Sequence, residues 1–99
     1  MTICIADLGS WGAATLVSEY DPEGDAIRIN ARAIACVRAA LGAHEARRFV
    51  ACAIEHERFH RACPHASEAE ARAHAAAATG ADAERYASVL AAHARARAS

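Results

Sequence analysis

The stretch FVACAIEHERFHRACP occupies residues 49–64 and decides the fold of this 99-residue chain. Its apolar side chains and histidines recur at steps of three and four residues, which is the spacing of one face of an α-helix. That face comprises Phe49, Cys52, Ala53, His56, Phe59, His60 and Cys63. Pro64 ends the pattern, because proline lacks the backbone N–H that a continuing helix needs. We therefore predict a helix over about residues 44–62, with both histidines on its inward face.

Two strand-like runs precede this helix. Residues 14–20 are rich in β-branched and aromatic side chains, and residues 26–30 alternate between apolar and polar ones. Between them, residues 21–25 (Asp-Pro-Glu-Gly-Asp) have the composition of a turn, because proline fixes φ and glycine permits a positive φ. The two runs therefore predict a β-hairpin. Residues 1–13 predict a short strand or irregular arm that ends in a glycine-rich turn.

Three further helices are expected, over residues 31–41, 67–79 and 82–97. Asn30 can cap the first of these helices, a capping box at Ser67 starts the second, and Asp82 opens the third. Gly42 ends the first and Gly80 ends the second. Strands followed by helices are typical of an α+β domain, here an N-terminal β-hairpin or small antiparallel sheet packed on about four helices. The length predicts one compact domain over residues 1–99.

Composition and charge exclude several functions. The formal net charge of −1 provides no electrostatic basis for binding nucleic acid or acidic membranes. The chain has no apolar run of about 20 residues, and its N-terminus lacks a basic region and contains Asp7, so neither a membrane span nor a signal peptide is expected. The four cysteines, Cys4, Cys36, Cys52 and Cys63, predict small buried side chains, with disulfides as the alternative. We expect a cytoplasmic protein.

Residues 56–60 form an H-E-x-x-H motif. His56 and His60 are four residues apart, so on a helix their imidazoles lie one above the other and can bind one zinc ion. Glu57 then lies beside the open position of the metal, where it can act as a general base toward a zinc-bound water. This combination predicts the chemistry of a metallopeptidase, a hydrolase that uses Zn²⁺.

A third ligand is expected on the next helix. The loop after Pro64 is only a few residues long, so the motif helix and the next helix should form an antiparallel hairpin. In that arrangement Glu70 and His74 face the two histidines, and Glu68 is the next candidate. A carboxylate completes the His₂Glu set typical of a catalytic zinc, which makes Glu70 the predicted ligand. The alternative is that Glu70 serves only as the third residue of a capping box that begins at Ser67.

These residues resemble the gluzincin clan of zinc peptidases, in which an H-E-x-x-H helix is followed by a glutamate on the next helix. The Ile-Arg-Ile-Asn strand, the backing helix and the Ser-Glu-Ala-Glu-Ala run at residues 67–71 resemble the minigluzincins and the compact peptidase domain of the ImmA/IrrE type. The resemblance covers about residues 14–80. It implies that the two histidines bind zinc together with Glu70, and that Glu57 is the general base. It also implies that the 26–30 strand pairs with an extended peptide substrate.

The favoured function is thus a small zinc-dependent metallopeptidase of the endopeptidase type, active or latent, whose partner is a peptide or protein substrate. Tyr20 or Tyr86 could polarise the scissile carbonyl. The alternative is a non-catalytic zinc-binding regulatory or interaction module, in which His74 or Cys63 closes the coordination. A ferritin-like carboxylate site is a third interpretation, because the motif also contains a Glu-x-x-His step, but the predicted β-hairpin argues against it.

Overall fold

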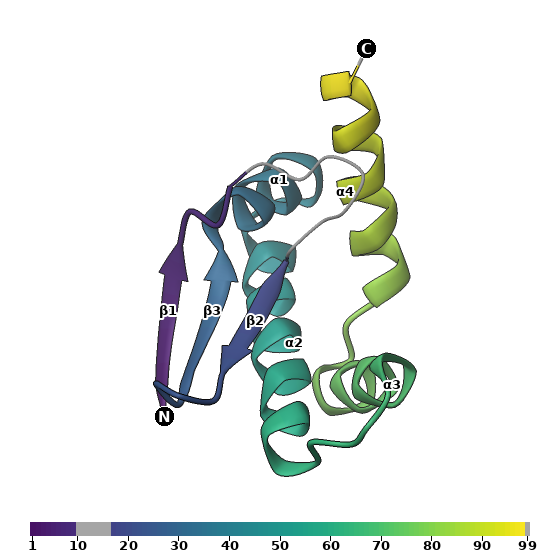
Figure 1. The fold of residues 1–99 in the computed structure, drawn as a ribbon. Coiled ribbons are helices and arrows are strands. Elements are labelled where there is room, and N and C mark those ends of the chain that lie inside the picture. Colours follow the sequence, from purple (N-terminus) through teal and green to yellow (C-terminus); the bar gives the residue numbers. More distant parts are fainter. Residues whose placement is uncertain (10–16, 99) are drawn as a thin grey trace.

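Strands at the N-terminus and helices in the rest of the chain make up an α+β fold, as the sequence predicts (Figure 1). The computed structural model describes residues 1–9 and 17–98. The strands in these residues are β1 (Thr2–Ala6), β2 (Ser18–Asp21) and β3 (Ala26–Asn30). The helices are α1 (Ala31–Leu41), α2 (Ala43–Ala62), α3 (Glu68–Thr79) and α4 (Ala83–Ala98). Each helix end lies within one residue of its predicted position.

The sheet has the strand order β1-β3-β2. β2 and β3 form the predicted antiparallel hairpin, in which Ser18 pairs with Ile29. The first strand adds a parallel partner on the other side of β3, with Ile3 opposite Ile27. The sheet is therefore mixed, and β3 has a neighbour on each side. Residues 14–16, which we expected at the start of the second strand, lie outside the described residues.

The helices lie on one side of the sheet (Figure 1). Ile27 and Ile29 of β3 are completely buried and pack with Ala53 of α2. Burying an isoleucine side chain contributes about 1.5–3 kcal/mol to folding, so these contacts fix α2 against the sheet. A second apolar cluster joins all four helices, and within it the rings of Phe49 and Tyr86 meet edge to face at a centroid distance of 5.3 Å. This cluster holds α4 against the N-terminal half of α2.

Asn30 links the end of β3 to the start of α1. Its side chain is buried and accepts a hydrogen bond from the backbone N–H of Arg32, which confirms the predicted N-cap. The same amide oxygen accepts a hydrogen bond from the backbone of Leu8, and the amide nitrogen donates to the Gly9 carbonyl. One polar residue therefore satisfies backbone groups from both the helix and the segment that follows β1.

A polar contact ties the C-terminal end of α2 to the hairpin turn. The Arg61 guanidinium donates to the Asp25 carboxylate at 2.7 Å, and the Tyr20 hydroxyl donates to the same carboxylate at 2.7 Å. These hydrogen bonds, Arg61 foremost, lower the pKa of Asp25 well below its ordinary value. Because Arg61 follows His60 directly, this contact fixes the end of α2 that carries the motif.

The cysteines differ from the prediction. All four are free thiols, and only Cys52 is buried, whereas Cys4 and Cys63 are exposed. The reason is position, because Cys4 lies on an edge strand and Cys63 is the C-cap of α2. Among the described residues, none of the helices combines the length and the apolar character that crossing a membrane requires.

Candidate metal centre

The two motif histidines lie on α2 where it passes the hairpin and α3. Their ring centroids are 4.9 Å apart, as expected for residues separated by one helical turn. Each side chain is about four-fifths covered, with 20% of its surface exposed. His56 and His60 therefore stand side by side in a partly desolvated position that still opens to solvent.

Glu68, the first residue of α3, brings a carboxylate to both imidazoles. Its Oε2 lies 3.1 Å from Nε2 of His56, and its Oε1 lies 2.7 Å from Nε2 of His60. One nitrogen or oxygen from each of the three residues can be chosen so that all lie within 4.8 Å of one another. Within the part of the chain that the structure describes, this is the one cluster of three or more such groups that could hold a metal ion.

The spacing fits a metal ion. Two ligands bound to one tetrahedral zinc at about 2.1 Å lie about 3.4 Å apart, close to the separations from Glu68 to the imidazoles. His60 adds a second indication, because its Nε2 has no solvent exposure and no hydrogen bond of acceptable geometry among the described residues, although Glu68 is near. A buried polar atom without a hydrogen bond is costly, and a metal ligated at Nε2 would satisfy it.

Glu70, the predicted third ligand, lies elsewhere. Its carboxylate accepts a hydrogen bond from the backbone N–H of Ser67, and its own N–H donates to the Ser67 hydroxyl, so the two residues form a capping box. Residues two apart on a helix point about 200° away from each other, and therefore Glu68 and Glu70 cannot face the same histidines. The structure thus replaces Glu70 with Glu68 as the candidate ligand, and the capping-box alternative for Glu70 is confirmed.

We call His56, His60 and Glu68 the ligand group. Glu57 is buried beside it, with 7% of its surface exposed. Its Oε2 accepts a hydrogen bond of 2.7 Å from the hydroxyl of Ser18, the first residue of β2. Sequence reasoning did not identify Ser18, and no local pattern could have done so, because the two residues are 39 positions apart. The hydrogen bond fixes the carboxylate that the motif assigns to proton transfer.

The residues considered as a fourth ligand do not reach the histidines. His74 stacks on Phe59 with a centroid distance of 4.6 Å, and its Nε2 lies 3.6 Å from a carboxylate oxygen of Glu55. Cys63 is exposed at the C-cap of α2 and is not part of the ligand group. In the described residues, nothing closes the ligand set in the way that a purely structural zinc site requires.

The two tyrosine hydroxyls considered for polarising a carbonyl are both engaged elsewhere. Tyr20 donates to Asp25 in the hairpin turn. Tyr86 donates to the carboxylate of Glu45 at 2.8 Å. Burial, together with this hydrogen bond, raises the pKa of Tyr86 to about 12. Neither hydroxyl is thus free to act at the ligand group as the side chains stand.

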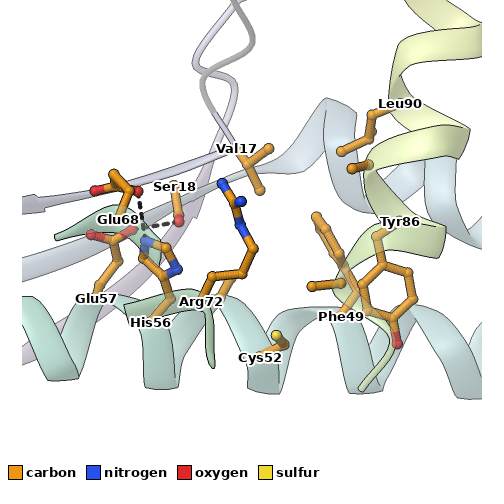
Figure 2. A pocket seen from close by; sticks show the side chains of 13 residues that line it. Val17, Ser18, Phe49, Cys52, His56, Glu57, Glu68, Arg72, Tyr86 and Leu90 are labelled. Atoms are coloured by element: carbon orange, nitrogen blue, oxygen red, sulfur yellow. Dashed lines mark hydrogen bonds and ion pairs between the residues drawn. The ribbon is translucent and has the colours of Figure 1, made fainter. Parts of the chain in front are cut away.

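A cavity of about 450 Å³ begins at the ligand group and extends toward the aromatic cluster. Figure 2 shows its polar end, with His56, Glu57, Glu68 and Ser18 together, and its apolar end, with Phe49, Tyr86 and Leu90. β2 contributes Ser18 to this cavity and is an edge strand of the described sheet. β3 is paired on both sides, so the expectation that the 26–30 strand pairs with substrate is wrong.

Three candidate ligands, a buried carboxylate and a cavity are thus assembled from one strand and several helices. The donor set of two imidazoles and one carboxylate is able to bind a metal ion. A comparison of the chain with known protein families, with curated proteins and with solved structures found no match.

Proposed function

We propose that this protein is a small zinc metallopeptidase of the gluzincin type that its sequence resembles, with His56, His60 and Glu68 as ligands. The observation that carries the proposal is the position of Glu68, which meets both imidazoles at 3.1 and 2.7 Å beside the buried Glu57. Imidazole nitrogens favour zinc over magnesium and calcium, which prefer oxygen ligands. A His₂Glu set also leaves a coordination position open for substrate and water.

The residues of the chain would divide the work of hydrolysis as follows. A zinc ion at the ligand group would polarise the scissile carbonyl and lower the pKa of a water molecule. Glu57 accepts a proton from the attacking water and returns it to the nitrogen of the leaving amine. Ser18 holds the Glu57 carboxylate in place through the 2.7 Å hydrogen bond. The partly covered position of the histidines keeps the reacting groups away from bulk water, which strengthens their electrostatic interactions.

An extended substrate would lie along β2 instead of β3. β2 is paired on one side only in the described sheet, so its outer edge can accept backbone hydrogen bonds from a peptide. Ser18 begins this strand and also contacts Glu57, which links the edge to the proton-transfer group. A peptide bound there would run past the ligand group.

The decisive experiment compares Glu57→Gln with wild type. The variant should keep one zinc per chain and an unchanged melting temperature, because Glu57 is outside the ligand group. Its turnover of a peptide library, detected by mass spectrometry, should fall by about 100-fold or more, since general-base catalysis contributes about 10²–10⁴-fold. Glu55→Gln, on the same helix and also outside the ligand group, is the matched control and should retain activity.

Three results would count against the proposal. Absence of zinc from purified wild type supplied with the metal would exclude the metal centre itself. Zinc in both proteins without cleavage by either would favour the non-catalytic binding module. Loss of zinc from Glu57→Gln would show that Glu57 is a ligand, which the proposed mechanism does not allow.

A further inference from the structure

Arg72 lines the same cavity as the candidate metal centre. It follows Glu68 by four residues on α3, so the two side chains leave the helix on one face. Figure 2 shows the Arg72 side chain reaching into the space between His56 and Phe49. Arg72 is an exposed residue, so its positive charge lies where the cavity meets solvent, between the polar and apolar ends that Figure 2 shows.

No hydrogen bond or ion pair within the described residues engages the Arg72 side chain. Arg32 lines a second groove and makes a useful contrast, because its guanidinium donates to both oxygens of Asp7 at 2.8 and 3.0 Å. An unpaired guanidinium that lines a cavity is well suited to bind a carboxylate, since its planar fork donates two parallel hydrogen bonds.

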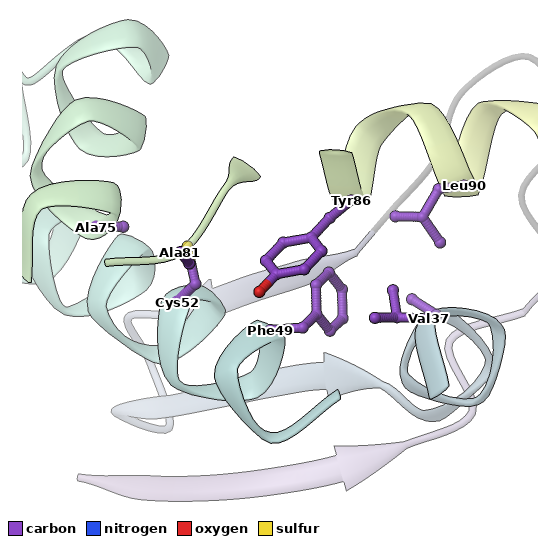
Figure 3. Close-up of a cluster of buried hydrophobic side chains, with 8 residues drawn as sticks. Val37, Phe49, Cys52, Ala75, Ala81, Tyr86 and Leu90 are labelled. Atoms are coloured by element: carbon purple, nitrogen blue, oxygen red, sulfur yellow. The ribbon is translucent and has the colours of Figure 1, made fainter. Parts of the chain in front are cut away.

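Beyond Arg72 the walls of the cavity are apolar. Phe49, Tyr86 and Leu90 form them, and Figure 3 shows that these side chains come from α2 and α4 and face one another. The Tyr86 hydroxyl is already bonded to Glu45, so this end of the cavity presents rings and methyl groups to a ligand. Such walls favour an aliphatic or aromatic side chain.

We propose that the cavity binds the C-terminal residue of a peptide, with its α-carboxylate on Arg72 and an apolar or aromatic side chain against Phe49 and Leu90. The candidate metal centre would meet the scissile amide of such a residue, Arg72 would bind its carboxylate, and the apolar walls would contact its side chain. Its volume of about 450 Å³ suits one residue and the amide before it better than a long segment. This inference rests on the proposed function, and it replaces the endopeptidase-type cleavage expected from the sequence with carboxypeptidase-type cleavage.

The reaction balances as a simple hydrolysis. Water adds across the last peptide bond, so that its hydroxyl becomes part of the new carboxyl group and its proton passes through Glu57 to the released amine. The C–N bond breaks, and no oxidant or reductant is needed. Arg72 stays bound to the carboxylate of the leaving amino acid and takes no part in proton transfer.

The test uses two substrates that differ only at the chain end: N-benzoyl-glycyl-L-phenylalanine and its C-terminal amide. Zinc-loaded wild type should prefer the free acid, and Arg72→Met should lower kcat/KM for the acid by about 10- to 100-fold, the usual effect of losing a hydrogen bond to a charged group. The amide should respond little to the substitution. Arg47→Met, an exposed position on α2 away from the cavity, is the control and should change neither rate.

A binding experiment separates this inference from the proposed function. N-acetyl-L-phenylalanine should bind to Glu57→Gln, and changes in the NMR chemical shifts of α3 and α4 would measure this binding. N-acetyl-L-phenylalaninamide should bind at least ten times more weakly. Adding Arg72→Met should remove that preference. If neither peptide is cut but the preference persists, the carboxylate pocket stands and the proposed function fails. If the amide is cut as fast as the acid, the inference is overturned while the metallopeptidase function stands. Equal binding of the acid and the amide would also overturn the inference, and the cleavage assay alone then decides the proposed function.

Discussion

The N-terminal half of α2 packs into the apolar core, whereas its C-terminal half carries the candidate metal centre. In the first half, Ala46 and Phe49 are more than nine-tenths buried, and Phe49 packs in the apolar cluster between the helices. In the second half the histidines are partly open, and the neighbouring contacts are made by charged groups such as Arg61 and Asp25. One helix thus combines a close-packed anchor with a polar, accessible segment that the anchor holds in position.

This difference has a physical consequence for stability. Apolar contacts such as those in the first half depend little on pH or metal, and the burial of apolar surface is the dominant favourable contribution to folding. Ion pairs in the second half are exposed and contribute little by themselves. We therefore expect substitutions in the first half to unfold the protein, and substitutions in the second half to change metal binding and local order.

The largest expected effect follows from removing the anchor. Phe49→Ala should lower the free energy of unfolding by about 3–5 kcal/mol, because it leaves a cavity against Tyr86. Phe59→Ala, in the partly open half, should cost clearly less. Urea denaturation of the metal-free proteins measures both values. Equal losses in the two variants would contradict the division of α2 into two halves.

Removing one imidazole should have a smaller effect that appears only with metal. His60→Ala should abolish stoichiometric zinc binding, and its melting temperature should match that of metal-free wild type. Wild type should gain stability when zinc is added, by about 2.7 kcal/mol at a zinc concentration 100 times the dissociation constant. Metal analysis and thermal denaturation with and without a chelator measure both quantities. A variant that still binds one zinc per chain would disprove the ligand assignment.

Glu68 and Glu70 offer the sharpest test of the third ligand. Glu68→Ala should weaken zinc affinity by more than tenfold and leave the metal-free fold intact, because this side chain is mostly exposed. Glu70→Ala should keep zinc affinity and lower the free energy of unfolding by about 0.3–1.5 kcal/mol, because the Ser67 N–H loses the hydrogen bond to the Glu70 carboxylate. Chelator competition measures the affinity and denaturation measures the stability. The reverse pattern would restore Glu70 as the ligand.

The helices could be predicted from the sequence because their start and stop signals are local. Asn30 and Ser67 cap the helices that follow them, and Gly80 ends α3, as the sequence predicted. The third ligand could not be predicted in the same way, because which side of α3 faces α2 depends on how the two helices pack. A shift of two residues in how α3 packs on α2 exchanges Glu68 for Glu70 as the residue that faces the histidines.

Contacts between residues that are far apart in the sequence could not be predicted either. Ser18 meets Glu57 only because β2 is the edge strand beside α2, and the order of the strands cannot be inferred from their individual patterns. The parallel pairing of β1 with β3 follows from the same arrangement. The motif thus identified the chemistry, and the packing of the sheet and α3 on α2 determined which carboxylates and hydroxyls accompany it.

The smallest expected effect is a loss of stability at the C-terminal end of α2 when the pH is lowered. Because the pKa of Asp25 is lowered in the folded protein, its contacts with Arg61 and Tyr20 stabilise the fold at neutral pH. That contribution is lost as the pH falls below about 4, the ordinary pKa of an aspartate, toward the lower folded value. Asp7 and Asp21 also have lowered pKa values, but their arginine partners lie outside α2.

Hydrogen exchange can therefore separate the two halves of α2. In metal-free wild type, after correction for the intrinsic pH dependence of exchange, acid should reduce protection around Arg61 more than around Phe49. Asp25→Asn should already show reduced protection around Arg61 at neutral pH, and acid should reduce it little further, because the titrating carboxylate is gone. If acid reduces protection equally in both halves, and does so in wild type and variant alike, then Asp25 does not hold the end of α2. The polar segment would in that case depend on the apolar anchor alone.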